Sequence, residues 1–310
     1  MKLLLTGASG FIGSAFLGAA IAAGHEVTAV GRDPGAWRLL PLAGRFVYIG
    51  ADLGDADTIV AILRAAAPEV VMHLAWHGVS GRERNAPEQI GNIGWTTGLF
   101  EASARAGVRH FVAAGSQAEY GPRSGPIAPT DPTYPTTLYG EAKLATCRLL
   151  TRLAQGRDIR LSWLRVFSTY GPGDHPYWML PSLIGSLLRG ERPALTLGEQ
   201  KWDFLNVSDA AQALLAVAAS PSAGGIYNLG SGTARRLREI VTMVRDAIDP
   251  ALPLGFGEIA YRDDQVMHLE ADITRLTTEL GWRPAVPLAE GIAATVKWYQ
   301  ANRWIFDAAA

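Results

Sequence analysis

The chain has 310 residues, of which 48% are hydrophobic and 18% are charged, and its formal net charge at pH 7 is −1. This composition is typical of a globular protein and gives no electrostatic reason to expect binding to nucleic acid or to an anionic membrane. With one cysteine, Cys147, an intramolecular disulfide is excluded. No apolar run approaches the roughly 20 residues that span a bilayer, and no secretory signal follows Met1. We therefore expect a cytoplasmic protein, and no metal site is predicted.

Strands and helices alternate along the first half of the chain. Short apolar runs predict strands, and longer alanine-rich or amphipathic stretches predict helices. The expected strands are 2–6, 27–30, 45–49, 70–74, 110–114 and 160–167, and the expected helices are 14–23, 56–67, 90–106 and 138–153. Gly24 is expected to end the first helix. This alternation predicts an α/β fold with a doubly wound parallel (Rossmann) sheet.

The rhythm changes after Tyr170, where shorter segments are separated by proline and glycine. Helices are expected at 179–188 and 288–302, and residues 204–229 have a strand-helix-strand pattern that is expected to return to the main sheet. We therefore predict a main domain of residues 1–170 with 201–230 returning to it. A smaller C-terminal domain would comprise 171–200 and 231–310.

A glycine loop, Gly7-x-x-Gly10-x-x-Gly13, joins the first strand to the first helix. Glycines at these positions allow a tight turn and let a pyrophosphate approach the N-terminus of the helix. The loop predicts a dinucleotide site.

The end of the second strand bears on the choice between NAD and NADP. An acid there would hold the ribose 2′-hydroxyl of NAD and repel the 2′-phosphate of NADP. Gly31 occupies that position and Arg32 follows it, which favours NADP(H) over NAD(H), although Asp33 remains within reach of the ribose. After the third strand, Asp52 and Leu53 are expected beside the adenine, and Asp52 is also a candidate N-cap for the next helix.

Three residues form a candidate catalytic group. Tyr139 and Lys143 are four residues apart, so they share one face of the predicted helix, where the lysine charge is expected to lower the tyrosine pKa. Ser116 follows the fifth strand, at the edge where doubly wound sheets bind ligands. It is not in a G-x-S-x-G elbow, so a hydrolase is not expected.

These motifs resemble those of the extended short-chain dehydrogenases/reductases of the nucleotide-sugar epimerase/dehydratase group. The matching residues are Thr6, Gly7, Gly10, Ile12, Gly13, Asp52, Leu53, His73, Leu74, Ala75, Asn92, Ser116, Tyr139, Lys143, Arg165, Phe167, Tyr170–Gly173, Asp203, Phe204, Val207, Asp209, Tyr227–Gly230 and Leu280–Pro284. The resemblance implies that Tyr139 is the general acid/base, that Lys143 holds the nicotinamide ribose, and that Ser116 binds the reacting oxygen.

The resemblance also implies the wider binding sites and a homodimer built on the helices that carry Tyr139 and Asn92. The implied cofactor contacts are Gly7, Ser9, Gly10, Phe11, Ile12, Arg32, Asp52, Leu53, Leu74, Ala75, Asn92, Tyr139, Lys143 and Val166. The implied contacts to a nucleotide-diphosphate sugar are Trp76, His77, Ser116, Gln117, Trp202 and Arg262. Trp202 stands where the family often has a phosphate-binding arginine, so it is expected either to stack on a base or to cover the core. His77 and His175 are either second acids or solvated loop residues.

Departures from the family pattern narrow the expected reaction. A 4,6-dehydratase needs Asp-Glu after the serine position, where this chain has Gln117-Ala118. Epimerase-reductases use a cysteine at the position of Ala118 and a histidine near Leu180, where Trp178 appears. We therefore expect NADPH-dependent reduction of a nucleotide-linked 4-keto-6-deoxy-sugar. An NAD-dependent 4-epimerase is the alternative. A non-catalytic NADP-binding sensor is less favoured, because such proteins typically lose the tyrosine or the lysine.

Overall fold

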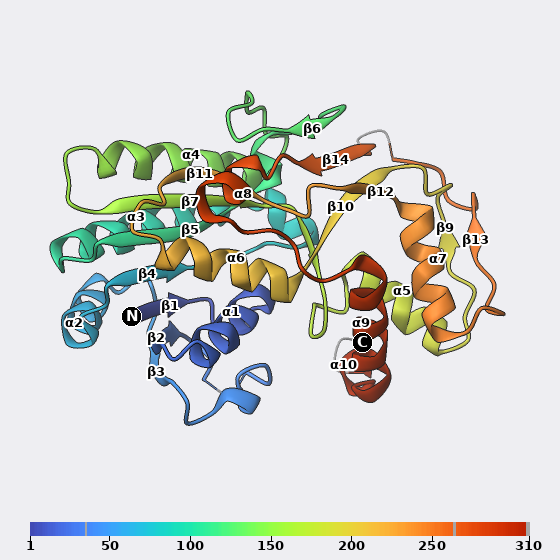
Figure 1. The fold of residues 1–310 in the computed structure, drawn as a ribbon, viewed down its shortest axis with the longest axis horizontal. Coiled ribbons are helices and arrows are strands. Elements are labelled where there is room, and N and C mark those ends of the chain that lie inside the picture. Colours follow the sequence, from blue (N-terminus) through green and yellow to red (C-terminus); the bar gives the residue numbers. More distant parts are fainter. Residues whose placement is uncertain (35, 263–264, 308–310) are drawn as a thin grey trace.

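The computed structural model describes residues 1–34, 36–262 and 265–307. Its main sheet has seven parallel strands in the order β11-β7-β5-β4-β1-β2-β3 (Figure 1). The strands are β1 (Lys2–Thr6), β2 (Glu26–Gly31), β3 (Val47–Gly50), β4 (Val70–His73), β5 (His110–Ser116), β7 (Arg160–Val166) and β11 (Gly225–Leu229). The predicted doubly wound parallel α/β fold is confirmed.

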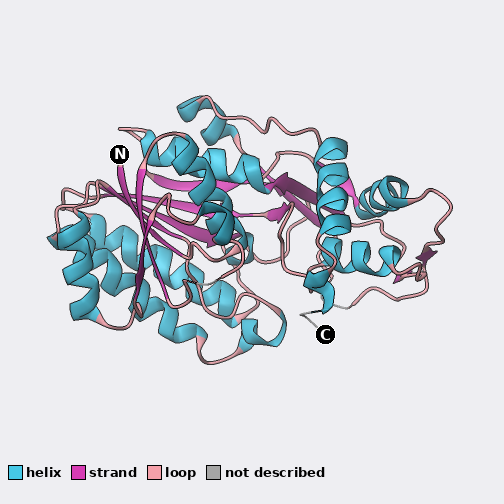
Figure 2. Ribbon diagram, turned by 90° about the horizontal axis from the view of Figure 1, so that it is seen from below, coloured by secondary structure: helices cyan, strands magenta, loops and turns pink. Residues whose placement is uncertain are grey.

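Helices cover both faces of this sheet (Figure 2). One face carries α1 (Phe11–Ala22) and α6 (Val207–Ala219), which pack against each other over the buried apolar side chains of β1 and β11. The other face carries α2 (Ala56–Ala66), α3 (Gln89–Arg105) and α4 (Leu138–Ala154), whose apolar sides enclose a second core cluster. The strands are therefore buried on both faces, which is why they appear in the sequence as continuous apolar runs.

Two predicted boundaries move in a way that matters for function. Helix α1 begins at Phe11 rather than at residue 14, because Gly10 already serves as its N-cap and the last glycine of the loop, Gly13, lies inside the helix. Strand β5 continues to Ser116, two residues beyond the predicted end, because residues 110–116 all pair with β7. The serine is therefore placed by the sheet itself.

The segment after Tyr170 returns to the main sheet only in part. β11 pairs with β7, but β10 (Lys201–Asn206) belongs to a second sheet, β12-β10-β14-β6, in which β8 also pairs with β10. The other strands are β6 (Pro126–Ile127), β8 (Ser168–Tyr170), β12 (Ala234–Arg236) and β14 (His268–Ala271). The buried carboxylate of Asp203 fixes β10 there by accepting hydrogen bonds from the backbone N–H groups of Ser231, Gly232 and Ala271.

A third core cluster lies beside the second sheet, to the right in Figure 1. It is enclosed by α5 (Met179–Leu188), α7 (Leu237–Ile248) and α9 (Leu288–Ala301), and α10 (Trp304–Asp307) adds Ile305. The remaining elements are α8 (Thr274–Leu280), the paired strands β9 (Ala194–Leu195) and β13 (Gly255–Phe256), and the short 3-10 helices η1 (Leu40–Leu42), η2 (Gly81–Asn85) and η3 (Gln117–Glu119). The division into two domains stays a prediction.

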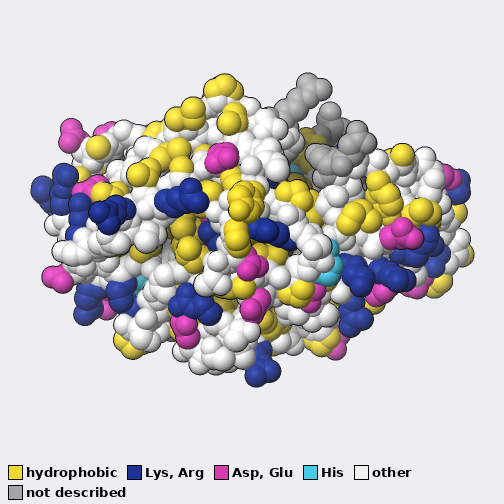
Figure 3. Space-filling model, turned by 90° about the horizontal axis from the view of Figure 1, so that it is seen from above, with side chains coloured by type: hydrophobic (Ala, Val, Ile, Leu, Met, Phe, Trp, Pro, Cys, Tyr) yellow, Lys and Arg dark blue, Asp and Glu magenta, His cyan; other side chains and the backbone are white. Residues whose placement is uncertain are grey.

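The surface charge is mixed. On the face shown in Figure 3, basic and acidic side chains occur together at both ends of the molecule. In the described part of the chain, no helix combines the length and the apolar content that crossing a bilayer requires. Within the same residues, no three His, Cys, Asp or Glu side chains are grouped so that they would hold a metal ion.

Candidate active site

The glycine loop is shaped by close contact with the end of β4. Gly7 has a φ of +77°, and a Cβ atom there would lie 2.6 Å from the Ala75 nitrogen. A Cβ on Gly13 would overlap the Gly7 carbonyl. Gly10 has no side chain to cap α1, so the first N–H groups of that helix face the loop. This glycine-lined helix N-terminus fits the pyrophosphate of a dinucleotide.

The ends of β2 and β3 lie next to this loop in the sheet. A Cβ on Gly31 would lie 2.8 Å from the Tyr48 hydroxyl, so the tyrosine fills the space that an acidic side chain would need. Arg32 is exposed. Asp52 accepts a hydrogen bond from Gly54 at 2.7 Å, whereas Asp55 caps α2 through the Thr58 N–H. The alternative that Asp52 is the N-cap is therefore wrong, since α2 starts one turn too late for it.

The segment that follows β4 is fixed by hydrogen bonds to Asn92 of α3. Asn92 is buried, and its amide accepts from the His77 N–H at 2.8 Å and donates to the His77 carbonyl at 3.1 Å. His73 lies between the Thr6 and Thr96 hydroxyls at 2.7 Å and 3.0 Å. Asn92 thus fixes the path of the loop that carries Trp76 and His77.

Ser116 and Tyr139 are brought together by two capped helix starts. The Ser116 oxygen accepts from the Ala118 N–H, and the Glu119 carboxylate accepts from the Ser116 N–H at 2.8 Å, which forms a capping box on η3. Thr137 caps α4, so Tyr139 lies in its first turn. Gly140 lets the two elements meet, because a Cβ there would lie 2.6 Å from the Ala118 carbonyl oxygen. The Ser116 side chain is near enough to the Tyr139 phenol to lower its pKa.

Lys143 lies one turn further along α4 and points into the sheet. Its ammonium donates to the Ala114 carbonyl at 2.7 Å and lies 3.7 Å from the centre of the Trp76 ring. Burial lowers the Lys143 pKa to about 7, while the Glu119 charge raises it. The centroid of the Tyr139 ring is 5.9 Å from this nitrogen.

The pKa of Tyr139 differs from the sequence-based expectation. Burial raises it, the Ser116 side chain and the charge of Arg84 lower it, and the charge of Glu119 raises it. The expected lowering by Lys143 is not found. The spacing puts both residues on one helical face, but the lysine turns towards Ala114 and Trp76, and desolvation of the phenol dominates.

Trp76 links these groups. Its ring meets the Tyr139 ring edge-on at 6.2 Å and 87°, and its indole N–H donates to Gln89 at 2.8 Å. The predicted residues Ser116, Tyr139, Lys143 and Trp76 therefore form one cluster at the carboxyl end of β5. Gln117 lies beside it in η3, and Val166 is the register partner of Ser116 in β7.

Other predicted substrate contacts lie elsewhere. The Trp202 indole donates to the Val266 carbonyl at 3.0 Å, and its ring packs against a cluster that contains Tyr120 and Phe167. Trp202 therefore covers the core, and its stacking on a base stays a prediction. Arg262 is exposed and adjoins residues 263–264, which lie outside the described residues. His175 packs on Tyr177 at 4.7 Å, and burial lowers its pKa.

Two charged residues near the cluster, Arg84 and Glu119, were missed by sequence reasoning, and Arg165 was matched to the family pattern without a role. Glu119 had a local signal, because the spacing Ser116-x-x-Glu119 is that of a capping box. Glu119 also accepts from the Trp163 indole at 2.9 Å and from Arg165 at 2.7 Å. Arg84, whose guanidinium lies 4.6 Å from the centroid of the Tyr139 ring, had no signal, since 55 positions separate the two residues.

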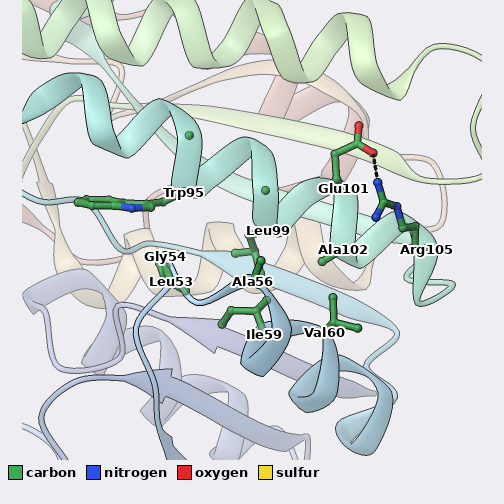
Figure 4. A pocket seen from close by; sticks show the side chains of 12 residues that line it. Leu53, Gly54, Ala56, Ile59, Val60, Trp95, Leu99, Glu101, Ala102 and Arg105 are labelled. Carbon is green, nitrogen blue, oxygen red and sulfur yellow. Dashed lines mark ion pairs between the residues drawn. The ribbon is translucent and has the colours of Figure 1, made fainter.

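A separate groove of about 260 Å³ lies between α2 and α3 (Figure 4). Its lining is mainly apolar, with Trp95 at one end and the Glu101–Arg105 ion pair at the other. Leu53 is its one residue among the predicted cofactor contacts. Because it contains no member of the Ser116 cluster, we take the cluster as the candidate active site.

The fold and this site define a class: a parallel α/β protein with a dinucleotide-type glycine cradle and a serine, a tyrosine and a lysine at the carboxyl end of its fifth strand. Residues 3–230 match the model of the NAD dependent epimerase/dehydratase family. The chain belongs to that family, so the predicted family of nucleotide-sugar enzymes is confirmed.

Several relatives cover nearly the whole chain. It is 30% identical over 319 residues to a dTDP-glucose 4,6-dehydratase from Streptomyces griseus, covering 97% of this chain and 94% of that protein. It is 30% identical over 313 residues to a UDP-glucose 4-epimerase from Mycolicibacterium smegmatis, covering 97% and 99%. Among solved structures, MoeE5 in complex with UDP-glucose and NAD is 32% identical with a TM-score of 0.86, covering 98% of this chain and all of that one.

Proposed function

We propose that the protein performs reversible oxidation and reduction at one carbon of a nucleotide-diphosphate sugar, and that its reaction is NAD-dependent 4-epimerisation. The observation that carries the proposal is the cluster of Ser116, Tyr139 and Lys143 with Gln117 and Ala118 beside it. This set provides proton transfer at one oxygen, and the Glu119 carboxylate beside it is held in an ion pair with Arg165, so dehydration is disfavoured although many relatives are dehydratases.

The chain's own groups would act on the sugar hydroxyl. A bound nicotinamide dinucleotide would accept hydride from the sugar carbon and return it. Tyr139 would take the hydroxyl proton during oxidation and give it back during reduction, and the Ser116 hydroxyl would hold the same oxygen. Lys143 would offer its remaining N–H donors to the cofactor ribose. The glycine cradle at Gly7 would hold the pyrophosphate.

NADPH-dependent reduction of a nucleotide-linked 4-keto-6-deoxy-sugar is the second candidate. It uses the same three side chains, and one feature favours it: Gly31 and exposed Arg32 occupy the strand end where an NAD-specific acid is expected. Epimerisation is preferred because relatives of this chain include a UDP-glucose 4-epimerase and a protein solved with UDP-glucose and NAD.

The test combines cofactor identification with a substrate panel. The protein is denatured to release bound cofactor, and the native protein is incubated with UDP-glucose, UDP-galactose and a dTDP-4-keto-6-deoxy-sugar, with and without NADPH. Epimerisation predicts bound NAD and interconversion of the UDP-sugars without added cofactor. NADPH consumption with only the keto sugar would instead establish the reductase, and binding of NADP without turnover of any substrate would contradict both.

The variant Tyr139→Phe tests the acid/base role of Tyr139. Removing the acid/base hydroxyl is expected to lower turnover by about 10²- to 10⁴-fold while the cofactor remains bound. Tyr134→Phe is the control, because the Tyr134 side chain is 68% exposed and its ring faces Arg123. Retention of full activity by Tyr139→Phe would exclude the proposed mechanism.

A further inference from the structure

A second cation lies over the candidate acid/base. Arg84 is half-buried in η2, and its guanidinium carbon lies 4.6 Å from the centroid of the Tyr139 ring. That is closer than Lys143, whose nitrogen is 5.9 Å from the same centroid. Among the residues that the structure describes, no carboxylate pairs with Arg84, so its charge is not neutralised by an ion pair.

The backbone around Arg84 is fixed by contacts of its two chain neighbours, Glu83 and Asn85. The Asn85 side chain accepts a hydrogen bond from the Leu138 N–H at 3.1 Å, which ties η2 to the first turn of α4. The Gln89 amide donates to the Glu83 carbonyl at 2.9 Å, which ties η2 to the start of α3. Arg84 lies between these two residues, so the backbone that carries its guanidinium is fixed beside the first turn of α4, and the guanidinium lies over the ring.

The other charged groups around Tyr139 do not replace Arg84. Lys143 is engaged by the Ala114 carbonyl and by the face of Trp76. Glu119, on η3, is a buried carboxylate whose negative charge disfavours a phenolate. Ser116, on β5, is neutral, and its side chain lowers the pKa of Tyr139. Arg84 is thus closer to the ring than Lys143 is, and its charge is not committed to another described partner.

We propose that Arg84 is a positioning residue that acts through Tyr139, holding the plane of the ring and stabilising the phenolate that accepts the proton of the sugar hydroxyl. The proposal rests on the acid/base function proposed for Tyr139. During oxidation, hydride leaves the sugar carbon for the nicotinamide and the hydroxyl proton moves to the phenolate oxygen. The charge on that oxygen is then lost, so the benefit from a nearby cation is greatest before proton transfer.

The test compares Arg84→Met and Arg84→Lys with the wild type in pH profiles of kcat and KM. Loss of the cation raises the pKa of Tyr139, so the rising limb of kcat should move upward by about one pH unit in Arg84→Met. At neutral pH, kcat should fall about tenfold with KM unchanged. Arg84→Lys should recover part of the loss. Arg148→Met, which removes an exposed arginine from α4, is the control and should match the wild type.

A turnover-independent readout separates this inference from the proposed function. Ultraviolet titration of the cofactor-loaded protein, with the Tyr139→Phe spectrum subtracted, reports ionisation of Tyr139 alone. A higher midpoint in Arg84→Met supports the inference even if no nucleotide sugar is turned over. Identical titrations in the two proteins would overturn it. A rise in KM with no change in kcat would also overturn it and would make Arg84 a substrate-binding group.

Discussion

Two buried cations near the carboxyl half of β5, Lys143 and Arg165, have different surroundings. Arg165 is paired: its guanidinium donates to Glu119 at 2.7 Å and to the Pro129 carbonyl at 3.2 Å. Lys143 is equally buried, at 3% exposed, but its hydrogen bond goes to the Ala114 carbonyl and not to a carboxylate. Burial opposes both charges, yet Glu119 raises the pKa of Arg165, whereas the pKa of Lys143 falls to about 7.

The difference shows how one carboxylate serves two purposes. The Glu119 carboxylate accepts hydrogen bonds from Arg165, from the Trp163 indole and from the Ser116 backbone N–H. It therefore fixes the position of Ser116 and neutralises the charge of Arg165. Lys143 has no hydrogen bond with Glu119 and interacts with it only through the charge of the carboxylate. Removing one partner of a buried ion pair leaves the other charge uncompensated, whereas a buried cation without a bonded carboxylate retains donors for a ligand.

The largest effect is expected from breaking the paired cation. Arg165→Met leaves Glu119 buried without its counter-ion, which should lower the free energy of unfolding by about 3–5 kcal/mol. The measurement is denaturant unfolding. The double variant Glu119→Gln with Arg165→Met removes both charges and keeps an acceptor for Ser116, so it should lose clearly less. Equal losses in the two variants would show that the ion pair is not what stabilises this region.

The low pKa of Lys143 should make the stability of the protein depend on pH. The Lys143 pKa is about 7 in the folded chain, against an ordinary value of 10.5, so between these values the unfolded chain binds more protons and stability rises with pH. From pH 7 to pH 9 the wild type should gain about 2 kcal/mol in free energy of unfolding relative to Lys143→Met.

Lys297→Met controls for this measurement, because Lys297 is exposed on α9. Its pH dependence should follow that of the wild type. If Lys143→Met also follows the wild type, Lys143 is not the depressed group, and the contrast with Arg165 fails.

The smallest effect is expected from an exposed cation, Arg32. If Arg32 binds the 2′-phosphate of NADP, Arg32→Gln should shift the ratio of NADP to NAD affinity by about tenfold towards NAD. Gly31 is left unchanged, because a side chain there would meet the Tyr48 hydroxyl. Arg45→Gln, another exposed arginine, is the control. An unchanged ratio would show that Arg32 does not select the cofactor.

Features encoded within short stretches were predicted well. The glycine loop, the alternation of strands and helices, and helix 179–188 follow from local backbone demands and from apolar runs that are buried on both faces. The prediction that the strand beginning near residue 204 returns to the main sheet was wrong for β10. This strand is fixed in the second sheet by the Asp203 carboxylate, which accepts hydrogen bonds from residues 28 to 68 positions away. Such partners leave no periodicity in the sequence.

The sequence by itself determined the family, the parallel fold and the three side chains of the candidate centre, because spacing along one helix and the end of one strand suffice to bring Ser116, Tyr139 and Lys143 to the same edge. Only the tertiary structure decided their electrostatics. Lys143 turns to Ala114 and Trp76, Glu119 is held by Arg165, and Arg84 reaches Tyr139 from η2. The physical reason is that a pKa depends on burial and on charges a few ångströms away, and these neighbours are distant in the sequence.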